Sequence, residues 1–207
     1  MPRPRSLSPR QLADAALAVL DRDGASGLSM RAVAAELRMS TMGLYRYVAD
    51  RDELERLIVD LVLGELDLEV PAEGPWRERI GELAHRAREA VARHPAAIPL
   101  LLLHRQDSEN SLRWGEAMLT VLAQAGFEDT ARTSAFRALM SYIFGALQVQ
   151  SYGPLDGTGT KVLAELPPER FPQLALTARA ARSIDPRDEF RAGLDALLRG
   201  LRPSAES

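Results

Sequence analysis

The 207-residue sequence contains no cysteine, and Lys161 is the only lysine among its 26 basic side chains. Without cysteine the chain can form no disulfide, no thiolate metal site and no cysteine nucleophile. We attribute the preference for arginine mainly to base composition. The sequence also has no run of about 18 apolar residues and no apolar segment near its N-terminus, so neither a membrane span nor a secretory signal is predicted. A cytoplasmic protein is expected.

Motifs typical of enzymes are missing as well. The sequence has no glycine-rich phosphate loop and no GxSxG motif. Its three histidines, His85, His94 and His104, are nine and ten residues apart, which is not the i, i+4 spacing that places two metal ligands on one helix face. We therefore expect no enzyme, no metal and no cofactor. His104 ends an apolar segment, where it would either cap a helix or hydrogen-bond a ligand.

Charge is distributed unevenly along the chain, although the net charge is only −3. Residues 1–51 hold eight arginines and five acidic residues, a net charge of +3, which leaves −6 for the remainder. A basic end on an acidic body is typical of a protein whose one end meets phosphate. The sequence pI of about 5.7 argues against a broad, non-specific nucleic-acid binder.

Residues 28–48, LSMRAVAAELRMSTMGLYRYV, are predicted to form two short helices joined by a tight turn. Ser29 and Ser40 are predicted N-caps, and Arg38 and Met39 form the turn between the helices. In the second helix, Leu44 and Val48 should face inward. The outward positions are Thr41, Met42, Gly43 and Tyr47. A short helix with a small, polar outer face fits the major groove of B-DNA.

The flanking residues predict a helix on each side of this motif. Ser8 and Pro9 supply an N-cap and an N1 proline for a first helix, which Gly24 ends. Asp50 and Glu53 resemble a capping box for a fourth helix. Residues 1–7 are interpreted either as an arm that touches DNA or as a terminus that contributes little.

Together these features resemble the DNA-binding domain of the TetR family of one-component repressors. The resemblance covers residues 8–61 and includes LYRYV and the acidic start of the fourth helix. It implies a homodimer that binds a palindromic operator on double-stranded DNA and releases it when a small-molecule effector enters a C-terminal pocket. Arg38 is a departure, because the family usually has glycine at that turn.

The resemblance also assigns DNA-contacting roles to residues of the motif. Thr41 would bond a base or phosphate and Met42 would contact a thymine methyl, while Gly43 allows close approach. Three further positions would hold phosphates and set the register, namely Tyr45, Tyr47 and Arg51. Arg31 resembles a family position that reaches DNA.

The remainder of the sequence predicts further helices, so the fold class is all-α. A break at residues 70–75 is followed by apolar stripes that predict helices over 76–95, 96–104, 112–126, 136–147, 171–183 and 186–201. Residues 153–168 contain three glycines and three prolines and are predicted to be a long loop. We divide the chain into a helix-turn-helix head, residues 1–50, and a ligand-binding and dimerisation domain, residues 51–207.

Two sets of C-terminal residues are functional candidates. The predicted effector pocket consists of apolar and aromatic candidates with Gln148 as a polar anchor: Leu63, Leu66, Leu101, His104, Trp114, Met118, Tyr142, Phe144 and Gln148. The predicted dimer interface is a four-helix arrangement implied by the family: Phe136, Met140, Ile143, Leu147, Phe190, Leu194, Leu197 and Leu198. The histidine and magnesium with which tetracycline-binding members hold their drug have no counterpart here, so tetracycline is not implied.

The predicted function is therefore that of a ligand-responsive transcriptional repressor. One alternative is a helical small-molecule carrier or enzyme whose head no longer binds DNA, which Gly43 and Arg38 favour because both weaken the motif. Another is a DNA-binding activator of transcription.

Overall fold

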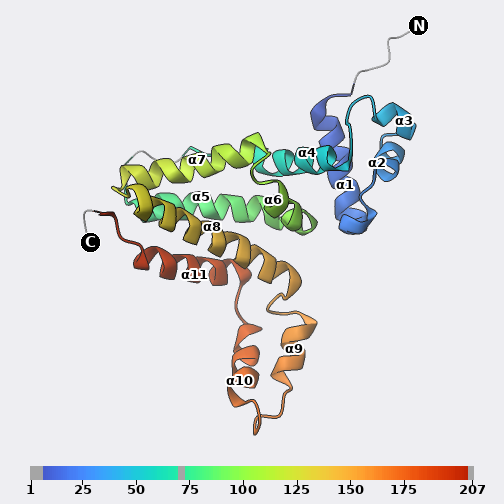
Figure 1. Cartoon of the computed structure of the whole chain (residues 1–207). Coiled ribbons are helices and arrows are strands. Elements are labelled where there is room, and N and C mark those ends of the chain that lie inside the picture. The colour runs from blue at the N-terminus through green and yellow to red at the C-terminus, as the bar shows by residue number, and fades with distance from the viewer. Residues whose placement is uncertain (1–6, 70–72, 205–207) are drawn as a thin grey trace. The chain divides into compact units, whose positions relative to one another are not determined.

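The computed structural model describes residues 7–69 and 73–204, and within these ranges the regular structure is helical throughout (Figure 1). The predicted N-terminal arm lies outside the described residues except for Leu7, as do residues 70–72 of the predicted break. None of the helices in the described ranges is long and apolar enough to cross a membrane. In chain order the elements are α1 (Pro9–Gly27), α2 (Met30–Glu36), α3 (Thr41–Leu44), α4 (Arg51–Gly64), α5 (Trp76–Ala92), η1 (Pro95–Ala97), α6 (Ile98–His104), α7 (Glu109–Gln124), α8 (Asp129–Tyr152), α9 (Thr158–Ala164), α10 (Pro172–Ala181) and α11 (Pro186–Gly200).

The helix starts in the N-terminal region follow from local capping chemistry. Ser8 forms a full capping box with Gln11, and Pro9 occupies the first turn of α1. Asp50 accepts a hydrogen bond from the backbone N–H of Glu53 at 2.8 Å and so caps α4. Within α1, Gly24 has φ 70° and ψ −179°, which interrupts the helix at the residue where the sequence predicted its end.

The motif predicted over residues 28–48 is present. The side chain of Ser29 accepts a hydrogen bond from Ala32 N–H at 3.2 Å, and that of Ser40 accepts one from Gly43 N–H at 3.1 Å. Between the two helices Arg38 has φ 54°, the left-handed backbone region that glycine adopts most readily. The turn therefore has the geometry that glycine would favour, and arginine is accommodated in it.

We expect Arg38→Gly to stabilise the protein, because it relieves a left-handed non-glycine residue. The strain is about 1–2 kcal/mol, and the extra freedom of glycine in the unfolded chain offsets about 0.4–1 kcal/mol of it. A net rise of roughly 0.5–1 kcal/mol in the free energy of unfolding should follow in urea denaturation. Arg38→Ala removes the same side chain but keeps Cβ, so it should give no such rise; equal effects of the two variants would contradict this account.

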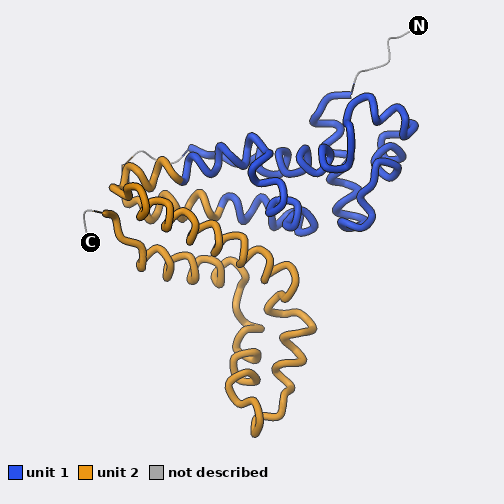
Figure 2. The backbone as a smooth tube through the Cα atoms, in the orientation of Figure 1, with its two compact units in different colours: residues 1–70, 86–118 blue, residues 71–85, 119–207 orange. Residues whose placement is uncertain are grey.

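The described chain divides into two compact units, each built from two separate stretches (Figure 2). Unit 1 comprises residues 1–70 and 86–118, and unit 2 comprises residues 71–85 and 119–207. Helices α5 and α7 each contribute residues to both units. This division does not follow the functional boundary predicted at residue 50, because α4 packs along α1 and so belongs to the same compact unit as the head.

Unit 1 is built around the contact between α1 and α4. Leu20 of α1 and Leu54 and Ile58 of α4 are fully buried, and α4 also contacts α6. The sequence predicted a kinked helix over residues 96–104. The structure has instead a short 3-10 turn, η1, followed by α6, with Pro99 in the first turn of α6, where its missing N–H costs no helical hydrogen bond.

In unit 2, helices α8 and α11 lie side by side (Figure 1). The hydroxyl of Tyr142 donates a hydrogen bond to the carbonyl of Phe190 at 2.7 Å, and their rings are 5.6 Å apart. Burial raises the pKa of Tyr142, and the nearby carboxylates of Glu189 and Asp195 raise it further. This tyrosine therefore belongs to the packing between the two helices.

The prediction of a long loop over residues 153–168 was wrong, because α9 forms within it. Helix α9 lies against α10, and the guanidinium of Arg179 donates a hydrogen bond to the carbonyl of Ala164, the last residue of α9, at 3.0 Å. Short helices depend on such tertiary contacts for stability. Helices α10 and α11 confirm the predicted pair that follows, within a few residues of the predicted bounds.

Candidate nucleic-acid interface and ligand-binding region

Helix α3 and the turn after it have one buried side and one exposed side. Leu44 is fully buried and Val48 is 2% exposed, as predicted, whereas Met42 is 76% and Tyr45 49% exposed. The exposed positions are those assigned to DNA by the resemblance to the TetR family. Thr41, Gly43 and Tyr47 are partly exposed. The α-helical part is only four residues long, and Arg46 and Tyr47 continue it with backbone hydrogen bonds to Gly43 and Leu44.

Gly43 has a second role that the sequence did not indicate. A Cβ at this position would lie 3.0 Å from Cε of Met39 and 3.2 Å from Oγ of Ser40, closer than ordinary contacts. Since the Ser40 hydroxyl caps α3 through the Gly43 N–H, glycine leaves room for the cap itself. Its presence in the helix therefore does not require close approach of DNA.

Three exposed arginines lie within the motif. Arg31 on α2 is exposed, as is Arg38 in the turn, and Arg46 lies between the two tyrosines that follow α3. Arg46 was not among the predicted DNA contacts. Its position between Tyr45 and Tyr47, on the same short segment, makes it a further candidate, because guanidinium groups are frequent phosphate contacts.

Arg51 is the most constrained of the predicted DNA contacts. Its Nε donates to Oε1 of Glu55 at 2.7 Å, and Nη2 donates to the carbonyl of Ala25 at 3.0 Å. The Arg51 side chain is 45% exposed, whereas that of Glu55 is only 6% exposed. The remaining guanidinium N–H groups suffice for a phosphate contact.

The predicted effector-pocket residues fall in both units. Leu63, Leu66, Leu101, His104, Trp114 and Met118 belong to unit 1, and Tyr142, Phe144 and Gln148 belong to unit 2. Five of the six in unit 1 are buried, and Leu66 and the three in unit 2 are partly exposed. Tyr142 bonds to Phe190, and Nε2 of His104 lies 2.9 Å from Oε2 of Glu55. Two of the nine, Tyr142 and His104, therefore already have protein partners.

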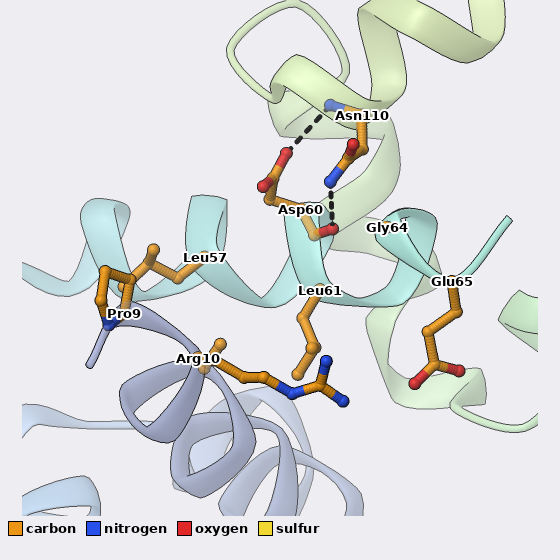
Figure 3. A pocket seen from close by; sticks show the side chains of 9 residues that line it. Pro9, Arg10, Leu57, Asp60, Leu61, Gly64, Glu65 and Asn110 are labelled. Atoms are coloured by element: carbon orange, nitrogen blue, oxygen red, sulfur yellow. Dashed lines mark hydrogen bonds between the residues drawn. The ribbon is translucent and has the colours of Figure 1, made fainter. Parts of the chain in front are cut away.

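A groove of about 270 Å³ lies in unit 1 between α1, α4 and the start of α7 (Figure 3). Its lining includes Leu57, Leu61 and Arg10 and none of the nine predicted pocket residues. Asp60, at its edge, accepts hydrogen bonds from Ser108 and from the backbone N–H of Asn110. The Asp60 carboxylate therefore serves to hold the start of α7 on α4.

The predicted dimer interface is largely buried within the chain itself. Ile143, Leu147, Phe190, Leu194 and Leu198 are 0–3% exposed. These five side chains therefore form part of the core of unit 2 within the single chain. Phe136, Met140 and Leu197 remain partly exposed on the same two helices, α8 and α11.

No group of three or more histidine and acidic side chains placed to hold a metal ion occurs in the part of the chain that the structure describes.

Comparison with known families identifies the chain. A family model described as the tetracyclin repressor-like, C-terminal domain matches residues 70–204, more than half of the chain. A second, described as bacterial regulatory proteins, tetR family, matches residues 12–56, which include the helix-turn-helix. The chain belongs to the TetR family of transcriptional regulators.

Curated relatives carry regulatory names. The chain is 32% identical over 161 residues to an HTH-type transcriptional regulator of Saccharopolyspora erythraea, covering 77% of this chain and 68% of that protein. It is 33% identical over 154 residues to the HTH-type transcriptional repressor DrrR1 of Streptomyces coeruleorubidus, covering 73% and 56% of the two chains. The tetracycline repressor protein class D of Escherichia coli is 28% identical over 198 residues, which cover 94% of this chain and 89% of that protein.

Solved structures agree with this assignment. ActR of Streptomyces coelicolor, determined without ligand and in complex with actinorhodin, superimposes with a TM-score of 0.79 at 27% identity and covers 96% of both chains. A possible TetR family regulator from Streptomyces coelicolor A3(2) gives a TM-score of 0.84 at 26% identity, covering 94% of this chain and 98% of that one. The all-α helix-turn-helix fold predicted from the sequence is thus confirmed.

Proposed function

We propose that this regulator is a repressor that binds a palindromic operator as a homodimer and is released from it by a small molecule. The observation that carries the proposal is the exposed surface of α3, with Met42 and Tyr45 outward and Leu44 inward. The local geometry of two other residues also supports the proposal. Arg38 and Gly43 weakened the motif in the sequence, and the structure accommodates both. The alternative of a carrier without DNA binding loses its main support.

Roles on DNA are assigned by exposure. Thr41, Met42 and Gly43 would approach base edges, and Arg31, Tyr45, Tyr47 and Arg51 would contact phosphates. We add Arg46, which is exposed beside the two tyrosines. Since two heads related by a two-fold axis must reach successive major grooves, the half-sites should be about 34–36 Å apart or a multiple of that distance.

Exposed apolar side chains support the proposed homodimer. Phe136, Met140 and Leu197 supply part of such an interface on α8 and α11. More apolar surface lies on the end of α8, on the hairpin of α9 and α10, and just beyond α10: Val149, Tyr152, Val162, Leu163, Leu174, Leu176 and Ile184. Exposed apolar surface of this kind is typical of protein–protein contacts.

The proposed effector is a small molecule, as in ActR, whose solved complex contains actinorhodin. The nine predicted pocket residues remain the candidates for its site. Release of DNA requires only that the ligand bind the released state more tightly, and couplings of about 1–3 kcal/mol are typical.

The decisive experiment is binding of the purified protein to the DNA directly upstream of its own coding region, followed from 50 to 200 mM salt. We expect tight binding that weakens steeply with salt, and Arg31→Ala should reduce the affinity by about tenfold or more, the effect of a lost charge-assisted hydrogen bond.

Arg182→Ala provides the matched control, because Arg182 is an exposed arginine of unit 2, far along the chain from the motif. It should bind like the unmodified protein. Binding no tighter than to random DNA would contradict the proposed function, and equal losses in both variants would contradict the role of Arg31.

A further inference from the structure

A buried carboxylate, Glu55, joins two charged or polar side chains on the inner side of α4. Oε1 accepts a hydrogen bond from Nε of Arg51 at 2.7 Å, and Oε2 lies 2.9 Å from Nε2 of His104. The side chains of Glu55 and His104 are each only 6% exposed. A carboxylate bonded through both oxygens has its plane fixed, so each partner restricts the orientation that the other can adopt.

The contacts continue from Arg51 into the head. Nη2 of Arg51 donates to the carbonyl of Ala25 at 3.0 Å, in the segment between the break at Gly24 and the start of α2. A continuous series of polar contacts therefore runs from the last residue of α6, through α4, to the entrance of the helix-turn-helix. All of these residues belong to unit 1.

The stretch of chain that ends at His104 begins at His94, and His94 contacts the head as well. Nδ1 of His94, directly before η1, lies 2.7 Å from Oδ2 of Asp21 on α1. The stretch from His94 to His104 is thus held at both ends by histidine–carboxylate contacts, one to α1 and one to α4. The contact of His104 is the more deeply buried, since the side chain of His94 is 26% exposed.

We propose that His104 is a positioning residue for DNA binding, which acts through Glu55 to hold Arg51 in the orientation that reaches a phosphate. This inference rests on the proposed function, because it assigns a phosphate contact to Arg51. It adds a residue remote in sequence from the motif and makes the position of α6 a determinant of operator affinity. Loss of the His104 contact frees one oxygen of Glu55, so the carboxylate can rotate and Arg51 loses its fixed orientation.

The salt dependence of operator binding distinguishes positioning from a purely structural role. Arg51→Ala should lower the slope of log affinity against log salt by about 1, the change for one phosphate contact. His104→Leu removes no cation from the head, yet it should lower the slope by about the same amount and weaken binding on the order of tenfold. The double variant should bind like either single variant, because both act on one contact.

Two further variants serve as the rescue and the control. His104→Gln retains an N–H donor toward Glu55 and should restore both slope and affinity. His85→Gln changes the third histidine, whose ring contacts Phe190 in unit 2, and should leave the slope unchanged. An unchanged slope in His104→Leu, or no rescue by glutamine, would overturn the proposal while the proposed function stands.

Thermal unfolding tests the coupling independently of DNA. The shifts in melting temperature caused by His104→Leu and Arg51→Ala should be non-additive, because Glu55 joins the two side chains. Additive shifts would overturn the proposal even if the protein binds its operator tightly. Failure of the unmodified protein to bind DNA, together with non-additive shifts, would reject the proposed function and the phosphate contact but leave the contact series intact.

Discussion

Leu44→Ala is expected to abolish operator binding, because it removes the main buried anchor of α3, a helix only four residues long. Leu44 is fully buried, and Val48 is the other inward side chain of this segment. Truncation of a buried leucine to alanine costs about 2–5 kcal/mol through lost burial and the cavity left behind. A loss of this size in the free energy of unfolding should appear as a lower urea midpoint.

Met42→Ala is the matched control on the same helix, since Met42 is 76% exposed. Its free energy of unfolding should change by no more than about 0.5 kcal/mol, as for most surface positions. The variant should nevertheless bind the operator more weakly, because the proposed role of Met42 is to contact a thymine methyl. Leu44→Ala with unchanged stability and binding, or Met42→Ala as destabilised as Leu44→Ala, would contradict this division of the helix.

The head was predictable because its determinants are local. Each predicted N-cap in this region is present, including Ser8, Ser29, Ser40 and Asp50, since a cap depends only on residues three or four positions away. The same locality explains the turn at Arg38. The two short helices predicted on either side required a tight turn there, and the backbone of Arg38 adopts the left-handed conformation.

Features that depend on distant residues were not predictable in the same way. Helix α9 has little helical signal of its own and is supported by α10, including the hydrogen bond from Arg179 to Ala164. Glu55 lies on the inner face of α4, and its partner His104 is 49 positions away. An acidic residue on an otherwise apolar stripe was the available signal, but it does not identify the partner.

The residues of the predicted dimer interface remain a prediction for a related reason, although five of them are buried within the chain itself. Periodic apolar residues show that a helix face is covered, but they do not show whether the same chain or a second chain covers it. Phe190 and Leu194 belong to the face by which α11 packs within unit 2 and are fully buried there.

The close contact between α8 and α11 predicts a second large loss in the free energy of unfolding. A Cβ added at Gly193 on α11 would lie 2.3 Å from Oη of Tyr142 and 2.8 Å from two of its ring carbons. The ring cannot simply move away, because its hydroxyl is bonded to the carbonyl of Phe190. Gly193→Ala should therefore separate α8 from α11 and lower the free energy of unfolding by about 1–3 kcal/mol, the usual cost of overpacking.

A change of glycine to alanine at Gly81 on α5 should instead raise the free energy of unfolding. A Cβ at Gly81 would meet no atom within 4 Å, so Gly81→Ala should stabilise unit 2 by about 1 kcal/mol through helix propensity alone. In a Tyr142→Leu background, Gly193→Ala should cost less than in the unmodified protein, because the ring that it meets is gone. Urea denaturation of these variants measures each difference, and an equal cost of Gly193→Ala in both backgrounds would show that contact with Tyr142 is not its cause.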